Sequence, residues 1–164
     1  MKIIPENKFH RAAIALGSNI GDAEVTFDNA CKMLENNAFH IISRAAVIKT
    51  APVDCPPGTP DFANSALIGT FAGTPEELLH ITQSIENALG RPSDHGFHTP
   101  RTLDLDIILF GDQQIDLPKL CIPHKLAQQR LFVLQPLSEI APDWIFPDSG
   151  ISVQDALKKL SGKL

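Results

Sequence analysis

Apolar residues recur along this chain with two periods, which together predict alternating strands and helices. Compact or β-branched apolar runs predict strands at 12–16, 41–50, 62–71 and 103–110. Between the first two runs, apolar residues recur at the spacing of one helix face: Phe27, Ala30, Cys31, Leu34 and Ala38. Segment 17–22 lacks the spacing of a phosphate-binding loop and predicts a tight turn, with Asp22 at the start of the helix.

The second predicted helix carries the clearest local signals. Thr74 is a typical N-cap, Pro75 suits the first helical position, and Glu77 completes a capping box three residues after the cap. Gly90 marks the end of the helix. The apolar stripe of this helix comprises Leu78, Ile81, Ile85 and Leu89.

Proline and glycine predict long, structured connections between these elements. Segment 51–61 is rich in proline, and segment 91–102 contains Pro92, Gly96 and Pro100. Beyond the fourth strand, the chain predicts a turn at Gly111 and Asp112, a proline-rich stretch to Pro123, a short helix near 126–130, and a last helix with Ser152 as N-cap.

The order strand, helix, strand, strand, helix, strand is that of a ferredoxin-like βαββαβ core. It predicts an α+β fold with a mainly antiparallel sheet and helices packed on it. The 164 residues fit one domain, 1–164, in which 1–11 form an N-terminal extension.

Composition and charge exclude several classes of protein. Hydrophobic residues make up 43% and charged residues 20%, as in globular proteins, so an intrinsically disordered chain is excluded. The net charge of −5 disfavours a protein whose main task is to grip nucleic-acid phosphates. We therefore expect no nucleic-acid partner, and we expect the chain to act as a monomer.

Three cysteines, Cys31, Cys55 and Cys121, are odd in number and form no CxxC pair, which argues against a disulfide framework and a structural zinc site. No apolar run is long enough to span a membrane, and the N-terminus does not resemble a signal peptide. These features predict a cytoplasmic protein without a membrane partner.

The sharpest chemical signal is the pair Asp104 and Asp106 in the fourth predicted strand. Strand side chains alternate, so both carboxylates lie on one face, about 7 Å apart, where they repel each other. A Mg²⁺ ion bound by one or two carboxylates and by substrate phosphates would remove this repulsion. The alternative is a solvated strand edge, but the apolar run 107–110 favours a central strand and hence a metal site.

Cationic residues flank this pair on both sides and suggest a polyphosphate ligand, because guanidinium groups bind phosphate oxygens in a bidentate manner. They are Arg91, Arg101, Lys119, His124, Lys125 and Arg130. Gln83 and Glu86 share one helix face and are either polar ligands or solvated side chains. His95, His98 and His124 lack the close spacing of a transition-metal site.

A flat ring could bind to Phe62, Asn64 and Phe132 by stacking and hydrogen bonding, although core packing explains the two phenylalanines equally well.

Four segments resemble the 6-hydroxymethyl-7,8-dihydropterin pyrophosphokinase family in sequence and order. They are ALGSNIGD (15–22), DFANSA (61–66), PRTLDLDIILFG (100–111) and IPHKLAQQRLFVLQPLSEIAP (122–142). The resemblance runs from about residue 12 to the C-terminus. It implies transfer of pyrophosphate from ATP to the hydroxymethyl group of a reduced pterin, with release of AMP, in folate biosynthesis.

The same resemblance implies a set of site residues. Asp104 and Asp106 would hold two Mg²⁺ ions on the ATP phosphates, and Arg91 and Arg101 would neutralise developing phosphate charge from a loop at 91–102 that closes as a lid. The positions that match ATP-binding residues are Gln83, Ile107, Lys119, His124, Lys125 and Arg130, and Glu86 matches a position that lines the site. The pterin would contact Phe62 and Phe132, the Asn64 side chain and the backbone near Thr50 and Val53.

Two other classes of protein share parts of this pattern. An RNA-binding module has the same order of elements, but it needs exposed aromatic residues on a basic sheet. A metal-dependent phosphohydrolase could use the same pair of aspartates, and hydrolysis of ATP without pterin would reveal it.

Overall fold

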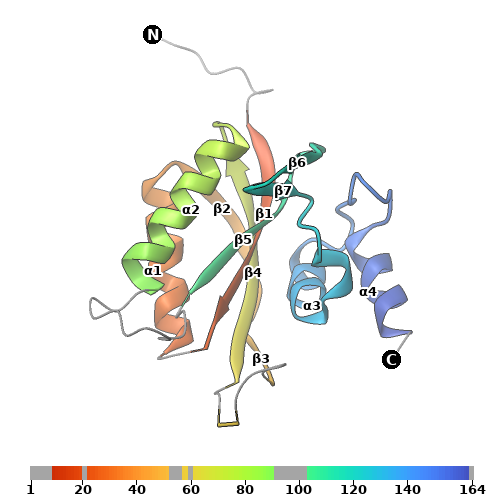
Figure 1. Cartoon of the computed structure of the whole chain (residues 1–164), viewed down its shortest axis with the longest axis horizontal. Coiled ribbons are helices and arrows are strands. Elements are labelled where there is room, and N and C mark those ends of the chain that lie inside the picture. The colour runs from red at the N-terminus through yellow and green to blue at the C-terminus, as the bar shows by residue number, and fades with distance from the viewer. Residues whose placement is uncertain (1–8, 20–21, 52–56, 59–60, 91–102, 163–164) are drawn as a thin grey trace.

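An antiparallel sheet lies between two pairs of helices (Figure 1). The computed structural model describes residues 9–19, 22–51, 57–58, 61–90 and 103–162. The strands of the sheet are β1 (His10–Ser18), β2 (Phe39–Arg44), β3 (Ile48–Thr50), β4 (Phe62–Phe71) and β5 (Asp104–Phe110). The helices α1 (Ala23–Asn36) and α2 (Pro75–Gly90) cover one face, and α3 (Leu131–Ile140) and α4 (Val153–Ser161) cover the other.

The strands lie in the order β2-β4-β1-β5, and β3 also pairs with β4. Every ladder between these strands is antiparallel, and with the order of strands and helices this confirms the predicted ferredoxin-like α+β fold. Among the residues that the structure describes, no helix has the length and apolar character needed to cross a bilayer.

Strand β5 lies at an edge of the sheet, so the expectation of a central strand was wrong. Its apolar residues are buried because helices cover both faces of the sheet. Ile107 and Phe110 belong to the core under α1 and α2, whereas Ile108 and Leu109 belong to the core under α3 and α4. A continuous apolar run therefore indicates burial on two faces and does not indicate a central position.

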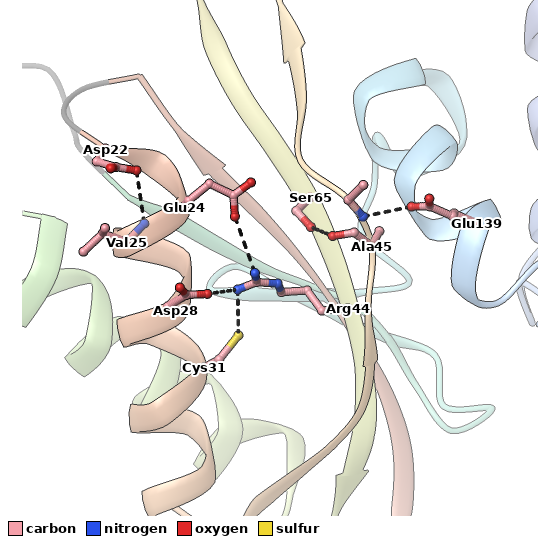
Figure 2. Close-up of polar contacts among 10 residues, drawn as sticks. Asp22, Glu24, Val25, Asp28, Cys31, Arg44, Ala45, Ser65 and Glu139 are labelled. Atoms are coloured by element: carbon pink, nitrogen blue, oxygen red, sulfur yellow. Dashed lines mark hydrogen bonds and ion pairs between the residues drawn. The ribbon is translucent and has the colours of Figure 1, made fainter.

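The strand predicted at 41–50 is two strands, because the regular ladder with β4 is interrupted at residues 45–47, where only the Ala45 N–H still donates to a β4 carbonyl, that of Ala66 (2.8 Å). Buried Ser65 donates a hydrogen bond to the Ala45 carbonyl (2.8 Å), and the Ala46 N–H donates to Glu139 of α3 (3.0 Å), as Figure 2 shows. These partners satisfy backbone groups that the β4 ladder does not pair. Beyond the break, β3 pairs again with β4 at the level of Asn64.

The predicted helix starts are confirmed by their capping bonds. The Asp22 side chain accepts from Val25 N–H, Thr74 and Glu77 form the reciprocal capping box, and Ser152 accepts from Asp155 N–H. Ala38 is not on the first helix face, because α1 ends at Asn36 and Ala38 has a left-handed backbone with φ of 65°.

A β-hairpin and the helix α3, both in the C-terminal part, were missed. Strands β6 (Ile115–Leu117) and β7 (Leu120–Ile122) form a hairpin within the proline-rich stretch. Helix α3 contains Pro136, which removes one helical hydrogen bond and usually marks a helix end. The short helix predicted near 126–130 is a 3₁₀ turn at Ala127–Gln129.

Gly69 of β4 provides a test of this packing. A Cβ at Gly69 would overlap the His40 carbonyl oxygen and the Phe39 ring, both of which are held in β2. We expect Gly69→Ala to lower the free energy of unfolding by about 3 kcal/mol, the upper part of the range for an overpacked core. Urea denaturation would measure it. Gly162→Ala is the control, because its Cβ would lie 3.4 Å from the nearest atom. Equal urea midpoints of unfolding for Gly69→Ala and Gly162→Ala would contradict the close contact between Gly69 and β2.

Candidate active site

The carboxylates of Asp104 and Asp106 line one cavity of about 520 Å³ on the α3 side of the sheet. Both residues are half-buried. The space above them exists because the paired residues of β1 are small: Gly17 lies opposite Asp104, and Ala15 lies opposite Asp106. The predicted pair therefore shares a face and opens onto a volume that can hold a ligand.

The opposite wall of this cavity gathers the residues predicted to bind a flat ring. Phe62 and Asn64 come from β4, Thr50 comes from β3, and Phe132 comes from the first turn of α3. Asn64 is buried, and its Nδ2 donates to Thr50 Oγ1 (2.9 Å). A Cβ at Gly17 would lie 3.4 Å from Asn64 Oδ1, so the missing side chain keeps that oxygen accessible from β1.

A second cavity of about 610 Å³ adjoins the first, and Asp106 lines both. Its walls come from β5, the β6–β7 hairpin, α2 and the segment before the 3₁₀ turn. The predicted residues that line it are Ile107, Lys119, His124 and Lys125. Arg130 lines the first cavity instead, where its guanidinium lies 5.5 Å from the centre of the Phe132 ring.

The imidazole of His124 is held in one tautomer. Its backbone N–H donates to Ile108 O (3.1 Å), which fixes the residue beside β5, and its Nδ1 accepts from Leu126 N–H (3.3 Å). Burial lowers the pKa of His124 below its ordinary value of 6.5; Asp106 opposes this shift and Arg130 adds to it. His124 is therefore neutral at pH 7 and carries its hydrogen on Nε2.

Two predicted ligands on α2 line neither cavity. Gln83 is exposed. Glu86 is half-buried, and its Oε2 accepts the backbone N–H of Leu105 (2.8 Å), the residue between the two aspartates. That Glu86 lines the site stays a prediction.

Several predicted residues lie outside the part of the chain that the structure describes. These are Val53, Arg91 and Arg101, together with the loop at 91–102 and its His95 and His98.

Sequence reasoning did not identify Leu79, Asp116, Ala15 and Gly17 as residues that line the cavities. A search for small residues at the end of the first strand could have found Gly17. Asp116 lies in the β6–β7 hairpin, so it could be found only if that hairpin had been predicted.

The donor set of the site fits Mg²⁺. Mg²⁺ usually binds to proteins through one or two carboxylates and completes its shell with water and substrate phosphates. Asp104 and Asp106 supply two carboxylates on one face of β5. Among the described residues, no three His, Cys, Asp or Glu side chains are grouped to form a cage of protein ligands alone.

Comparison with known proteins agrees with this geometry. Residues 13–142 match the family model described as 7,8-dihydro-6-hydroxymethylpterin-pyrophosphokinase. The 2-amino-4-hydroxy-6-hydroxymethyldihydropteridine pyrophosphokinase of Bacillus subtilis is 42% identical over 133 residues, which cover 79% of this chain and 77% of that protein. The protein of the same name from Synechocystis is 36% identical over 151 residues, which cover 92% of this chain and 76% of that protein.

Solved structures of longer proteins share the fold. A Plasmodium falciparum HPPK-DHPS triple mutant matches with a TM-score of 0.75 at 16% identity, over 96% of this chain. The chain spans only 45% of that protein, and only 27% of the Arabidopsis thaliana folate synthesis bifunctional protein, to which it is 35% identical over 132 residues.

Fold, carboxylate pair and family match define the class of protein as a pyrophosphokinase, an enzyme that transfers a diphosphate group. The chain belongs to the 7,8-dihydro-6-hydroxymethylpterin pyrophosphokinase family.

The lowered pKa of His124 gives a pH prediction. Its imidazole should titrate below pH 6.5 in an NMR titration of the ring nitrogens. The unfolded chain then takes up this proton first, so the free energy of unfolding should decrease as the pH falls through the ordinary histidine value toward the folded pKa. Asp106→Asn removes a charge that favours the imidazolium, so it should lower the pKa further. A higher pKa in Asp106→Asn would contradict this account.

Proposed function

We propose that the two adjoining cavities bind the two substrates of this family's reaction, so that Asp106 stands where they meet. The chain transfers pyrophosphate from ATP to the hydroxymethyl group of 6-hydroxymethyl-7,8-dihydropterin in folate biosynthesis. The observation that carries the assignment of the cavities is that Asp106 lines both of them. A phosphate chain held at this carboxylate through Mg²⁺ would extend from the nucleotide toward the pterin.

The reaction needs positioning and charge neutralisation more than covalent help from the protein. The hydroxyl oxygen of the pterin forms a bond to the β-phosphorus of ATP and loses its proton to solvent. The bond from that phosphorus to the oxygen bridging to the α-phosphate breaks, and AMP leaves. Mg²⁺ would supply charge neutralisation at the phosphates. Asp104 and Asp106 would hold the metal, and we propose two ions.

The cavity beside the β6–β7 hairpin suits the nucleotide. Lys119 and Lys125 bring positive charge to it, and Ile107 adds an apolar surface. Neutral His124 donates a hydrogen bond from Nε2 to a phosphate oxygen, a role supported by its tautomer and its place beside Asp106. Arg130, on the border of the other cavity, binds phosphate oxygens from the opposite side.

The cavity beside α3 suits the pterin. Phe62 and Phe132 supply the two aromatic surfaces that a flat heterocycle can contact. One Nδ2 hydrogen of Asn64 is used by Thr50, which fixes the amide and leaves Oδ1 as an acceptor for a ring N–H. The backbone near Thr50 and Val53 completes the polar edge.

Arg91, Arg101 and Gln83 enter the proposal from the family resemblance. Gly90 and Leu103 flank the segment with the two arginines and lie in contact, since a Cβ at Gly90 would meet Leu103 N at 3.1 Å. The two described residues that flank the segment therefore lie next to Asp104, which supports a role for the arginines at the phosphates. Gln83 would meet the nucleotide from α2.

The alternative RNA-binding function needs an open sheet face. Here α1 and α2 cover one face of the sheet, and α3 and α4 pack on the other. The single-domain organisation, the monomeric state and the cytoplasmic location stay predictions.

The product of the reaction is the first test. Purified protein with ATP, pterin and Mg²⁺ should release AMP, because the attack is at the β-phosphorus, and omission of pterin or of Mg²⁺ should abolish the release. Chromatography of the nucleotides would measure it. ADP as the main product would refute pyrophosphate transfer, and hydrolysis without pterin would favour a phosphohydrolase.

The carboxylates are the second test. Asp104→Asn and Asp106→Asn should each lower kcat at least about 100-fold, the range for loss of one charge-stabilising group. The ligand-free fold should survive, because each substitution removes a like-charge repulsion. Asp112→Asn, in the turn at the other end of β5, is the matched control and should keep its activity. Near-wild-type turnover of either site variant at low Mg²⁺ would disprove the metal role.

A further inference from the structure

We infer that Glu86 is a positioning residue, which fixes the separation of Asp104 and Asp106 by holding the backbone between them. The inference rests on the proposed function, because it assumes that the two carboxylates bind the metal. It assigns Glu86 a role through the strand in place of a direct contact with the nucleotide.

The geometry is specific to one peptide group. Glu86 lies on α2, and its Oε2 accepts the N–H of Leu105 at 2.8 Å in a partly buried position. The side chain of Leu105 is only 4% exposed and packs in the core under α1 and α2. The bond therefore ties helix and strand together at the midpoint of the Asp104–Asp106 pair.

The position of β5 explains why this bond matters. An antiparallel edge strand alternates between residues that bond to the neighbouring strand and residues whose N–H points away from it. Because Leu105 N–H points to Glu86, Asp104 and Asp106 direct their backbone groups to Gly17 and Ala15 of β1. Strand β1 thus holds the two aspartates on one side, and Glu86 holds the residue between them on the other.

Loss of the carboxylate would leave the Leu105 N–H without its acceptor in a partly buried place, which destabilises the local strand geometry. A shift of this edge would move both carboxylates relative to the phosphates, and misplacement by 1 Å can cost about 100-fold in rate. The walls that would hold the pterin come from β3, β4 and α3, so they should be affected much less.

Three variants separate this role from a direct ligand. Glu86→Ala removes the acceptor, Glu86→Gln keeps an amide oxygen that can accept the same N–H, and Gln83→Ala is the control on the exposed face one turn earlier. Hydrogen exchange of the Leu105 amide, followed by NMR without ligands, reports the bond itself. The Leu109 amide on the same strand reports any global loss of stability.

We expect Glu86→Ala to speed exchange at Leu105 at least about 10-fold relative to Leu109, to lower kcat about 100-fold, and to leave pterin affinity within about threefold. Calorimetry should show weaker Mg²⁺-dependent binding of a non-hydrolysable ATP analogue. Glu86→Gln should restore both Leu105 protection and most of kcat. Gln83→Ala should leave Leu105 protection unchanged.

The inference holds if Leu105 protection and kcat change together in the Glu86 variants. It is overturned if Glu86→Gln keeps Leu105 protected but loses kcat, as expected for a carboxylate that binds metal or nucleotide directly. It is also overturned if Leu105 loses protection while kcat stays unchanged. If Glu86→Ala fails to fold, the comparison of Leu105 protection and kcat in Glu86→Gln tests the inference. The exchange measurement needs no substrate, so failure of wild-type protein to release AMP would refute the proposed function separately.

Discussion

Two carboxylates that repel each other on one face of an edge strand form the constraint on which the rest of the site depends. Asp104 and Asp106 lie half-buried beside one cavity, where their like charges repel each other and a bound cation would reduce the repulsion. The opposing strand accordingly places Gly17 and Ala15 beneath that volume. The first turn of α3, with Phe132, closes the volume from the far side without filling it.

The same pair divides the site into two halves with different chemistry. Phenylalanine and amide groups line the half near α3, whereas Lys119 and Lys125 line the half near the β6–β7 hairpin. Only Asp106, among the described residues, lines both halves. Neutral His124 beside it can donate a hydrogen bond from Nε2 without adding a full charge to the junction.

The sheet can support this site because both of its faces are covered. Buried apolar residues on each face hold β1 and β5 in place, and so the polar residues at the strand ends can be arranged for binding. The break between β2 and β3 also helps to position residues of the site. Ser65 and Glu139 form hydrogen bonds with the backbone groups of residues 45 and 46. Strand β3 then pairs with β4 again, and Asn64 donates a hydrogen bond to Thr50.

The sequence by itself determined the features that depend on near neighbours. Helix starts with their caps, strand β4 to the residue, and the shared face of Asp104 and Asp106 follow from spacings of two to four residues. Tertiary structure alone decided that β5 lies at the edge, that β2 and β3 separate, that α3 tolerates Pro136, and that Glu86 reaches Leu105. These features depend on pairs of residues far apart in the chain, and such pairs form only when the whole core packs, so no local pattern encodes them.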